Sequence, residues 1–283
     1  AAKVNDRYGA TPLHSACQYG ASLDLVSLLL SSWQDAARVK DINGLSPLHS
    51  ACQHGASYDV VSLLLSSWPY AAKKKCINGR TPLHSACQYG ASLDIVSLLL
   101  RSFPDAARKM DIHDRTPLHS ACHFGASFGV VSLLLSTWPE AAEVKNRLFQ
   151  TPLRCACRYG SSLDVVQLLL ERWLENKENR NSCRVESLGH NAPESIKDLL
   201  YHISYLFSEK QSESFPMDIM ECFITINWWN GVLLVIEMYP TITKTLDLQT
   251  IVMADFLSRV GKCCSLTTMF GVIKNEPDLL EGV

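Results

Sequence analysis

The sequence predicts an all-α protein, built as a solenoid in which short helix–turn–helix pairs stack side by side. Three observations predict this fold: a motif that recurs every 35 residues, Gly and Pro at fixed places in each unit, and apolar residues three and four apart. The motif is TPLHSAC or a close variant, at residues 11–17, 46–52, 81–87, 116–122 and 151–157. Because two short helices cannot bury their apolar surfaces alone, neighbouring units must stack.

Each unit begins with a turn and a first helix. Thr81 is expected to cap a helix that runs from Pro82 to about Tyr89, because threonine is a good N-cap and proline fits the first helical position. Gly90 is expected to end this helix, since glycine adopts the left-handed conformation at little cost.

A second helix follows, and Asp94 favours its N-terminal end. Its apolar stripe consists of Leu93, Val96, Leu99 and Leu100. Phe103 and Pro104 then stop the helix. An aromatic residue recurs at this stop and is expected to wedge into the core in every unit, as Trp33, Trp68, Phe103, Trp138 and Trp173.

The repeated unit resembles a known family. Gly79-Arg80-Thr81-Pro82-Leu83-His84-Ser85-Ala86 and Gly90 carry the hallmark GxTPLHxAxxxG, so the unit is similar to the ankyrin repeat. The resemblance covers residues 1–175 as five repeats, the first of which is expected to begin in the loop after a preceding outer helix. It implies an ankyrin-repeat solenoid of stacked helix–turn–helix pairs, with an irregular helical extension after it.

Three features depart from the usual ankyrin pattern. Each unit is two residues longer than the common form of about 33 residues. Asp114 and Phe149 replace the turn glycine, so the turns at these two positions are expected to be less regular. Arg154 replaces the motif histidine.

The last hundred residues lack the clear motif. Residues 176–193 are polar and aperiodic, which predicts a linker or loop. Residues 194–283 are expected to be helical. Tyr239-Pro240 lies as far before Gly261 as Trp68-Pro69 lies before Gly90, and this register predicts two diverged ankyrin repeats, with helices over 217–226, 231–238, 253–260 and 266–278. The alternative is a separate helical bundle.

The composition disfavours several classes of function. Charged residues are balanced, with 26 Lys plus Arg against 28 Asp plus Glu, which gives no global case for nucleic-acid binding. No apolar run is long enough for a membrane-spanning helix. Most of the 11 cysteines occupy small core positions of the repeats, so an intracellular location, cytoplasmic or nuclear, is expected. The protein is also expected to be a monomer.

Neither a metal site nor a catalytic site is predicted. The motif histidines recur once per repeat, about 8–10 Å apart at helix-packing distances, whereas zinc ligands must all lie about 2 Å from one ion. Cys155 with Cys157 and Cys263 with Cys264 are the close pairs, and neither has a matching CxxC partner. No nucleophile elbow, phosphate loop or HExxH motif occurs. We therefore expect no cofactor and no enzyme activity.

The ankyrin resemblance gives roles to two sets of residues. It implies that the motif histidines bond locally beside the capping Thr or Ser, which makes a structural set of Thr11, His14, Ser46, His49, Thr81, His84, Thr116 and His119. It also implies a partner-binding face on the turn tips and the exposed side of the first helices, with Arg7, Tyr8, Gln18, Tyr19, Asn43, Gln53, His54, Asn78, Gln88, Tyr89, His113, His123, Phe124, Arg158 and Tyr159.

The expected function is therefore a scaffold or adaptor that binds an unidentified protein. Three alternatives stay open at this point. The aromatic residues of the face can simply pack on their neighbours, the chain can be a regulatory segment of a larger enzyme, or residues 174–283 can form a zinc- or redox-dependent helical domain.

Overall fold

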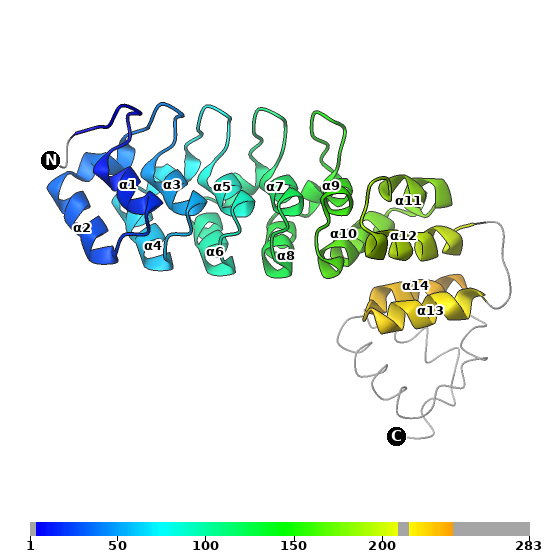
Figure 1. Ribbon diagram of the computed structural model, residues 1–283. Coiled ribbons are helices and arrows are strands. Elements are labelled where there is room, and N and C mark those ends of the chain that lie inside the picture. The colour runs from blue at the N-terminus through cyan, green and yellow to red at the C-terminus, as the bar shows by residue number, and fades with distance from the viewer. Residues whose placement is uncertain (1–3, 209–214, 240–283) are drawn as a thin grey trace, which may run out of the picture. The chain divides into compact units, whose positions relative to one another are not determined.

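The computed structural model describes residues 4–208 and 215–239, which contain fourteen α-helices and no β-strand (Figure 1). The chain divides into two compact units. The first runs up to Trp173 and includes Asn191–Ile196; the second consists of Leu174–His190 and the described residues from Lys197 on.

The first unit is a row of five helix pairs (Figure 1). Its inner helices are α1 (Pro12–Gln18), α3 (Pro47–Gln53), α5 (Pro82–Gln88), α7 (Pro117–His123) and α9 (Pro152–Tyr159). Its outer helices are α2 (Leu23–Ser32), α4 (Tyr58–Ser67), α6 (Leu93–Ser102), α8 (Phe128–Thr137) and α10 (Leu163–Glu175), the last of which continues past the unit's boundary. Short 3-10 turns, η1 (Gln34–Arg38), η2 (Pro69–Lys73), η3 (Pro104–Arg108) and η4 (Pro139–Glu143), follow the first four. The predicted all-α solenoid is confirmed.

The inner helices begin and end as the sequence predicts. Pro82 occupies the first turn of α5, and Thr81 caps it. After α1, Gly20 takes a left-handed conformation with φ 67°, and Ala21 N–H donates to the carbonyl oxygen of Ala16 over 2.9 Å. This bond satisfies a carbonyl that a helix end leaves unpaired, and glycine permits it without steric cost.

The core of the first unit is a set of layers that repeat from one helix pair to the next. Each inner helix buries one leucine and at least one cysteine, and each outer helix buries valine and leucine. Leu83 and Cys87 of α5 and Val96 and Leu99 of α6 are each at most 1% exposed. Inner helices pack on inner helices and outer on outer, so every pair covers its neighbour.

A hairpin turn, which we call a finger, precedes every inner helix. The fingers comprise residues 6–10, 41–45, 76–80, 111–115 and 146–150, and in Figure 1 they project from one edge of the row. In the second finger, Asp41 Oδ1 accepts the N–H groups of Asn43 and Leu45 over 2.9 and 2.8 Å. Neighbouring tips join through the backbone, as where Ile77 N–H donates to Asn43 oxygen over 2.9 Å.

The expected irregularity of the fourth and fifth fingers is wrong. Asp114 and Phe149 adopt φ 57° and 56°, close to the glycine they replace. Their N–H groups donate to the carbonyls of Asp111 and Asn146 over 3.0 and 2.9 Å, as in the other fingers. The finger's hydrogen bonds impose the left-handed conformation, which costs an ordinary side chain about 1–2 kcal/mol.

The second unit contains η5 (Lys177–Asn179), α11 (Ser182–Leu188), most of α12 (Glu194–Leu206), α13 (Phe215–Thr225) and α14 (Trp229–Met238). The predicted loop over 176–193 is therefore corrected, because α11 lies within it. Val185 and Leu188 are buried, and Asn181 caps the helix by accepting from Arg184 N–H. A helix this short owes its stability to that burial, which leaves little periodic signal in the sequence.

Helices α13 and α14 lie close to the predicted helices over 217–226 and 231–238. They form a hairpin in which the rings of Phe223 and Trp228 meet edge to face, 4.8 Å apart. A Cβ on Gly231 would stand 2.2 Å from the Trp228 ring, so only glycine fits there. The predicted helices over 253–260 and 266–278 lie outside the described residues.

Candidate functional site

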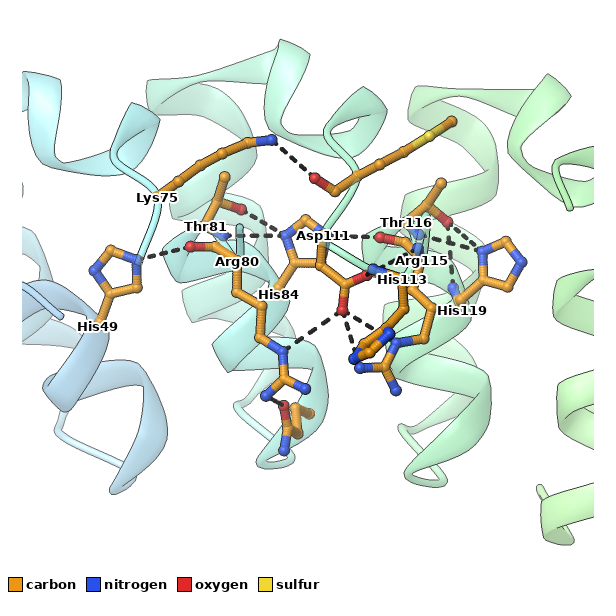
Figure 2. A network of polar contacts seen from close by, with 12 residues as sticks. His49, Lys75, Arg80, Thr81, His84, Asp111, His113, Arg115, Thr116 and His119 are labelled. Atoms are coloured by element: carbon orange, nitrogen blue, oxygen red, sulfur yellow. Dashed lines mark hydrogen bonds and ion pairs between the residues drawn. The ribbon is translucent and has the colours of Figure 1, made fainter. Parts of the chain in front are cut away.

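Each motif histidine bridges its own helix cap to the next finger. His84 Nδ1 accepts the backbone N–H of Thr81 over 3.2 Å and lies 2.9 Å from Thr81 Oγ1, while Nε2 lies 3.1 Å from the carbonyl oxygen of Arg115 (Figure 2). Since Nδ1 accepts, the proton belongs on Nε2, which donates to that carbonyl. The same bridges join His14 to Leu45, His49 to Arg80 and His119 to Gln150 over 3.0–3.1 Å.

Burial keeps these imidazoles neutral. Desolvation lowers the pKa of His49, His84 and His119 to about 4, although the carbonyl partner of each ring opposes the shift, and it lowers the pKa of His14 as well. A protonated ring would lose the acceptor that holds the capping N–H. The histidines therefore serve as buried connectors between repeats in this geometry.

The repeated cysteines are buried and are expected to react poorly as thiolates. Cys17, Cys52, Cys87, Cys122 and Cys157 are buried and free. Burial raises the pKa of Cys17, Cys87 and Cys157 to about 12 and raises that of the other two further. Within residues 4–208 and 215–239, no three His, Cys, Asp or Glu side chains gather closely enough to hold a metal ion.

An aromatic ladder marks the exposed side of the inner helices. It consists of Tyr19, His54, Tyr89, Phe124 and Tyr159, each at the end of its inner helix and each exposed. Tyr19 is 80% exposed, and the exposed fractions of Tyr89, Phe124 and Tyr159 are between 43% and 52%. The register follows from the caps, because each ladder residue directly precedes the left-handed glycine that follows its inner helix.

Two ladder residues, Phe124 and Tyr159, both contact the ring of His123. The ring of His123 lies 3.7 Å from the ring of Tyr159 and 4.5 Å from that of Phe124. Packing on neighbours therefore accounts for part of the ladder at this end. The side chain of Gln88, which precedes Tyr89, is hydrogen-bonded, since its oxygen accepts from Arg80 Nη1 over 2.6 Å. Gln18 and Gln53 precede Tyr19 and His54 at the same register.

The finger tips carry the other predicted residues. Arg7 lies over the ring of Tyr8 at 4.7 Å, and Asn43, Asn78 and His113 are exposed. Exposed isoleucines stand beside three of these tips, at Ile42, Ile77 and Ile112. The tips thus form an edge of mixed polar and apolar character parallel to the aromatic ladder.

Phe149 was absent from the predicted site. It is 81% exposed in a left-handed conformation, and the adjacent Leu148 is 72% exposed. A bulky side chain with positive φ is uncommon, and strained positions of this kind cluster at functional sites. The signal was visible in the sequence, where a phenylalanine occupies the glycine position of the turn.

A buried carboxylate lies beneath the face, between the third and fourth fingers. The Asp111 side chain is 1% exposed, receives Nε and Nη2 of Arg115 over 3.1 and 3.0 Å, and lies 3.7 Å from Nε of Arg80 (Figure 2). Burial by itself would raise its pKa. Hydrogen bonds from the N–H groups of Arg115 and His113, together with the Arg115 guanidinium, outweigh burial and lower it.

Comparison with known proteins identifies the family. Residues 1–73, 69–147 and 105–181 each match the family model described as ankyrin repeats in three copies. The chain belongs to the ankyrin-repeat family. A search of curated proteins finds no match. The ankyrin matches end at residue 181, so helices α11–α14 lie beyond them.

Membership of the ankyrin family bears on the site in a general way. Ankyrin repeats are protein–protein interaction modules and are typically non-catalytic. In this ankyrin array, large side chains are exposed on the ladder and the finger tips, and others are exposed on the outer helices and η2. No described helix is long and apolar enough to cross a membrane.

Proposed function

We propose that this ankyrin array is a non-catalytic scaffold or adaptor, monomeric and intracellular, that binds a partner protein across the aromatic ladder and the finger tips. The observation that carries the proposal is the exposure of four aromatic rings at one register position, Tyr19, Tyr89, Phe124 and Tyr159. The free thiols of the described cysteines fit a reducing compartment.

The ladder residues are more exposed than most residues of their helices. In α5, Pro82 to Cys87 are buried, whereas Tyr89 at the end of the same helix is half exposed. Tyrosine supplies large contact area at a low cost in side-chain entropy, and aromatic residues dominate the energetics of protein interfaces. A row of such side chains on a rigid stack therefore suits binding better than folding.

Partner capture with two matched variants tests the proposal. The first changes Tyr19, Tyr89, Phe124 and Tyr159 to Ala. The second changes Tyr58, Tyr70 and Phe128 to Ala, which are exposed aromatic residues of the outer helices and of η2. Circular dichroism first establishes that both variants fold.

The ladder variant is expected to lose the proteins that the wild-type chain retains from a lysate, and the outer variant is expected to keep them. If both variants retain the same partners, or if both lose them, the ladder is not the binding surface and the proposal is wrong.

A further inference from the structure

The inner face of the ankyrin array carries no acidic side chain on any of its helices. None of α1, α3, α5, α7 and α9 contains Asp or Glu. Four of the five outer helices differ, since Asp24, Asp59, Asp94 and Asp164 lie in their first turns. The two sides of the stack thus differ in charge.

Positive charge is concentrated in the last three repeats. From finger to inner helix, residues 76–89, 111–124 and 146–159 carry five arginines against two aspartates, a net charge of +3. The corresponding residues of the first two repeats, 6–19 and 41–54, carry Arg7 against Asp6 and Asp41, a net charge of −1. The difference arises partly because Cys76 and Asn146 replace the finger aspartate.

Four of these arginines form what we call the cationic face: Arg80, Arg115, Arg154 and Arg158. The guanidinium of Arg80 reaches α5 at Gln88, and Arg158 lies over the Tyr159 ring at 5.8 Å. Arg154 and Arg158 are one helical turn apart, so they share a face of α9. Arginine is thus interleaved with the aromatic ladder.

The outward positive charge lies mainly on Arg154 and Arg158, because the side chains of Arg80 and Arg115 are only 22% and 18% exposed. Asp111, which pairs with Arg80 and Arg115, is almost fully buried, so an approaching chain does not meet its carboxylate. A guanidinium has five N–H donors in a fork that matches a carboxylate. Arg80 and Arg115 already contact Asp111, so the forks of Arg154 and Arg158 are the ones that a partner meets.

We infer that the cationic face binds an acidic segment of the partner protein, in which Glu or Asp side chains alternate with apolar ones. This inference rests on the proposed function and specifies its partner chemistry. The carboxylates pair with the forked donors of Arg154 and Arg158, and the apolar side chains lie on the rings of Phe124 and Tyr159 beside them.

A peptide fits better than a nucleic acid. Domains that bind nucleic acid carry a strongly basic surface, whereas this chain has a formal net charge of −2 and a pI of about 6.5. A short acidic segment needs only the few arginines present here.

The test uses the full chain and fluorescence anisotropy with four probes. They are a labelled peptide of alternating Glu and Leu with a central Tyr, the same peptide with Gln for Glu, the same with Lys for Glu, and a labelled oligouridylate. Arg158→Gln removes an exposed charge of the cationic face, and Arg101→Gln removes an exposed charge of outer helix α6 as the matched control.

The wild-type chain is expected to bind the Glu peptide, and the affinity should fall as salt is raised to about 0.15 M and above. Arg158→Gln should weaken binding about tenfold, the scale of one charge-assisted hydrogen bond, and Arg101→Gln should leave it unchanged. Equal binding of the Glu and Gln peptides, equal binding by both variants, or tighter binding of oligouridylate would overturn the inference.

Failure to bind the Glu peptide would also overturn it. That result would leave the proposed function standing wherever the ladder variant still loses the proteins that the wild-type chain captures. The capture experiment therefore tests the proposed function, and the peptide experiment separately tests the acidic-segment inference.

Discussion

Mild acid is expected to unfold the ankyrin array through its motif histidines. Burial holds the pKa of His49, His84 and His119 at about 4, against 6.5 in an unfolded chain. A folded-state pKa below the unfolded value means that the unfolded chain binds more protons. The stabilisation is therefore complete above pH 6.5 and is lost as the pH falls toward 4.

The expected loss of folding free energy in mild acid is large for a protein of this size. Between pH 7 and pH 5, each histidine loses about 2 kcal/mol of folding free energy, so the three together lose about 5 kcal/mol. His14 adds to this in the same direction. Since folded proteins are stable by about 5–15 kcal/mol, the loss is a large share of the total.

Urea unfolding followed by far-ultraviolet circular dichroism at several pH values measures this effect. The slope of the unfolding free energy is expected to approach about 4 kcal/mol per pH unit near pH 5, since three protons are taken up. His84→Gln removes one titrating group and should reduce that slope by about one third. An unfolding free energy that is the same at pH 5 and pH 7, or a slope that His84→Gln leaves unchanged, would show that the buried histidines do not control acid unfolding.

Three further predictions follow from single positions. Phe149→Gly should raise the unfolding free energy by about 1 kcal/mol in urea titration, because glycine relieves the left-handed strain; lower stability would contradict this. Cys76→Asp should also stabilise by about 1 kcal/mol, because a carboxylate there can accept the finger N–H groups as Asp41 does, and a destabilised variant would argue against that bond pattern. Among the described cysteines, a maleimide should label the exposed Cys183 first in the native chain, as read by mass spectrometry; equally fast labelling of Cys87 would show that the stack is open.

The repeat architecture could be predicted because its signals are local. Thr81, Pro82 and Gly90 cap, start and end a helix by their own conformational preferences, and the 35-residue period extends that assignment to all five units. Helix α11 could not be predicted in this way, since two apolar residues that become buried in the second unit stabilise it.

The candidate site could be predicted from the sequence only in part. The register of the motif places the ladder residues on one face, so their exposure at that face follows from the sequence. The buried Asp111 with Arg80 and Arg115 did not follow, because that contact exists only once two fingers have stacked. The regular turns at Asp114 and Phe149 were missed because finger hydrogen bonds override local preference.

Site-specific photocrosslinking shows whether the ladder face contacts a partner protein. A benzophenone amino acid replaces Tyr89 of the ladder in one protein and Tyr58 of outer helix α4 in another, both of them exposed positions. After irradiation in a lysate, mass spectrometry identifies the crosslinked proteins. A discrete partner is expected from position 89 and none from position 58. The same set of proteins from both positions, or none from either, would show that the ladder face does not bind a partner.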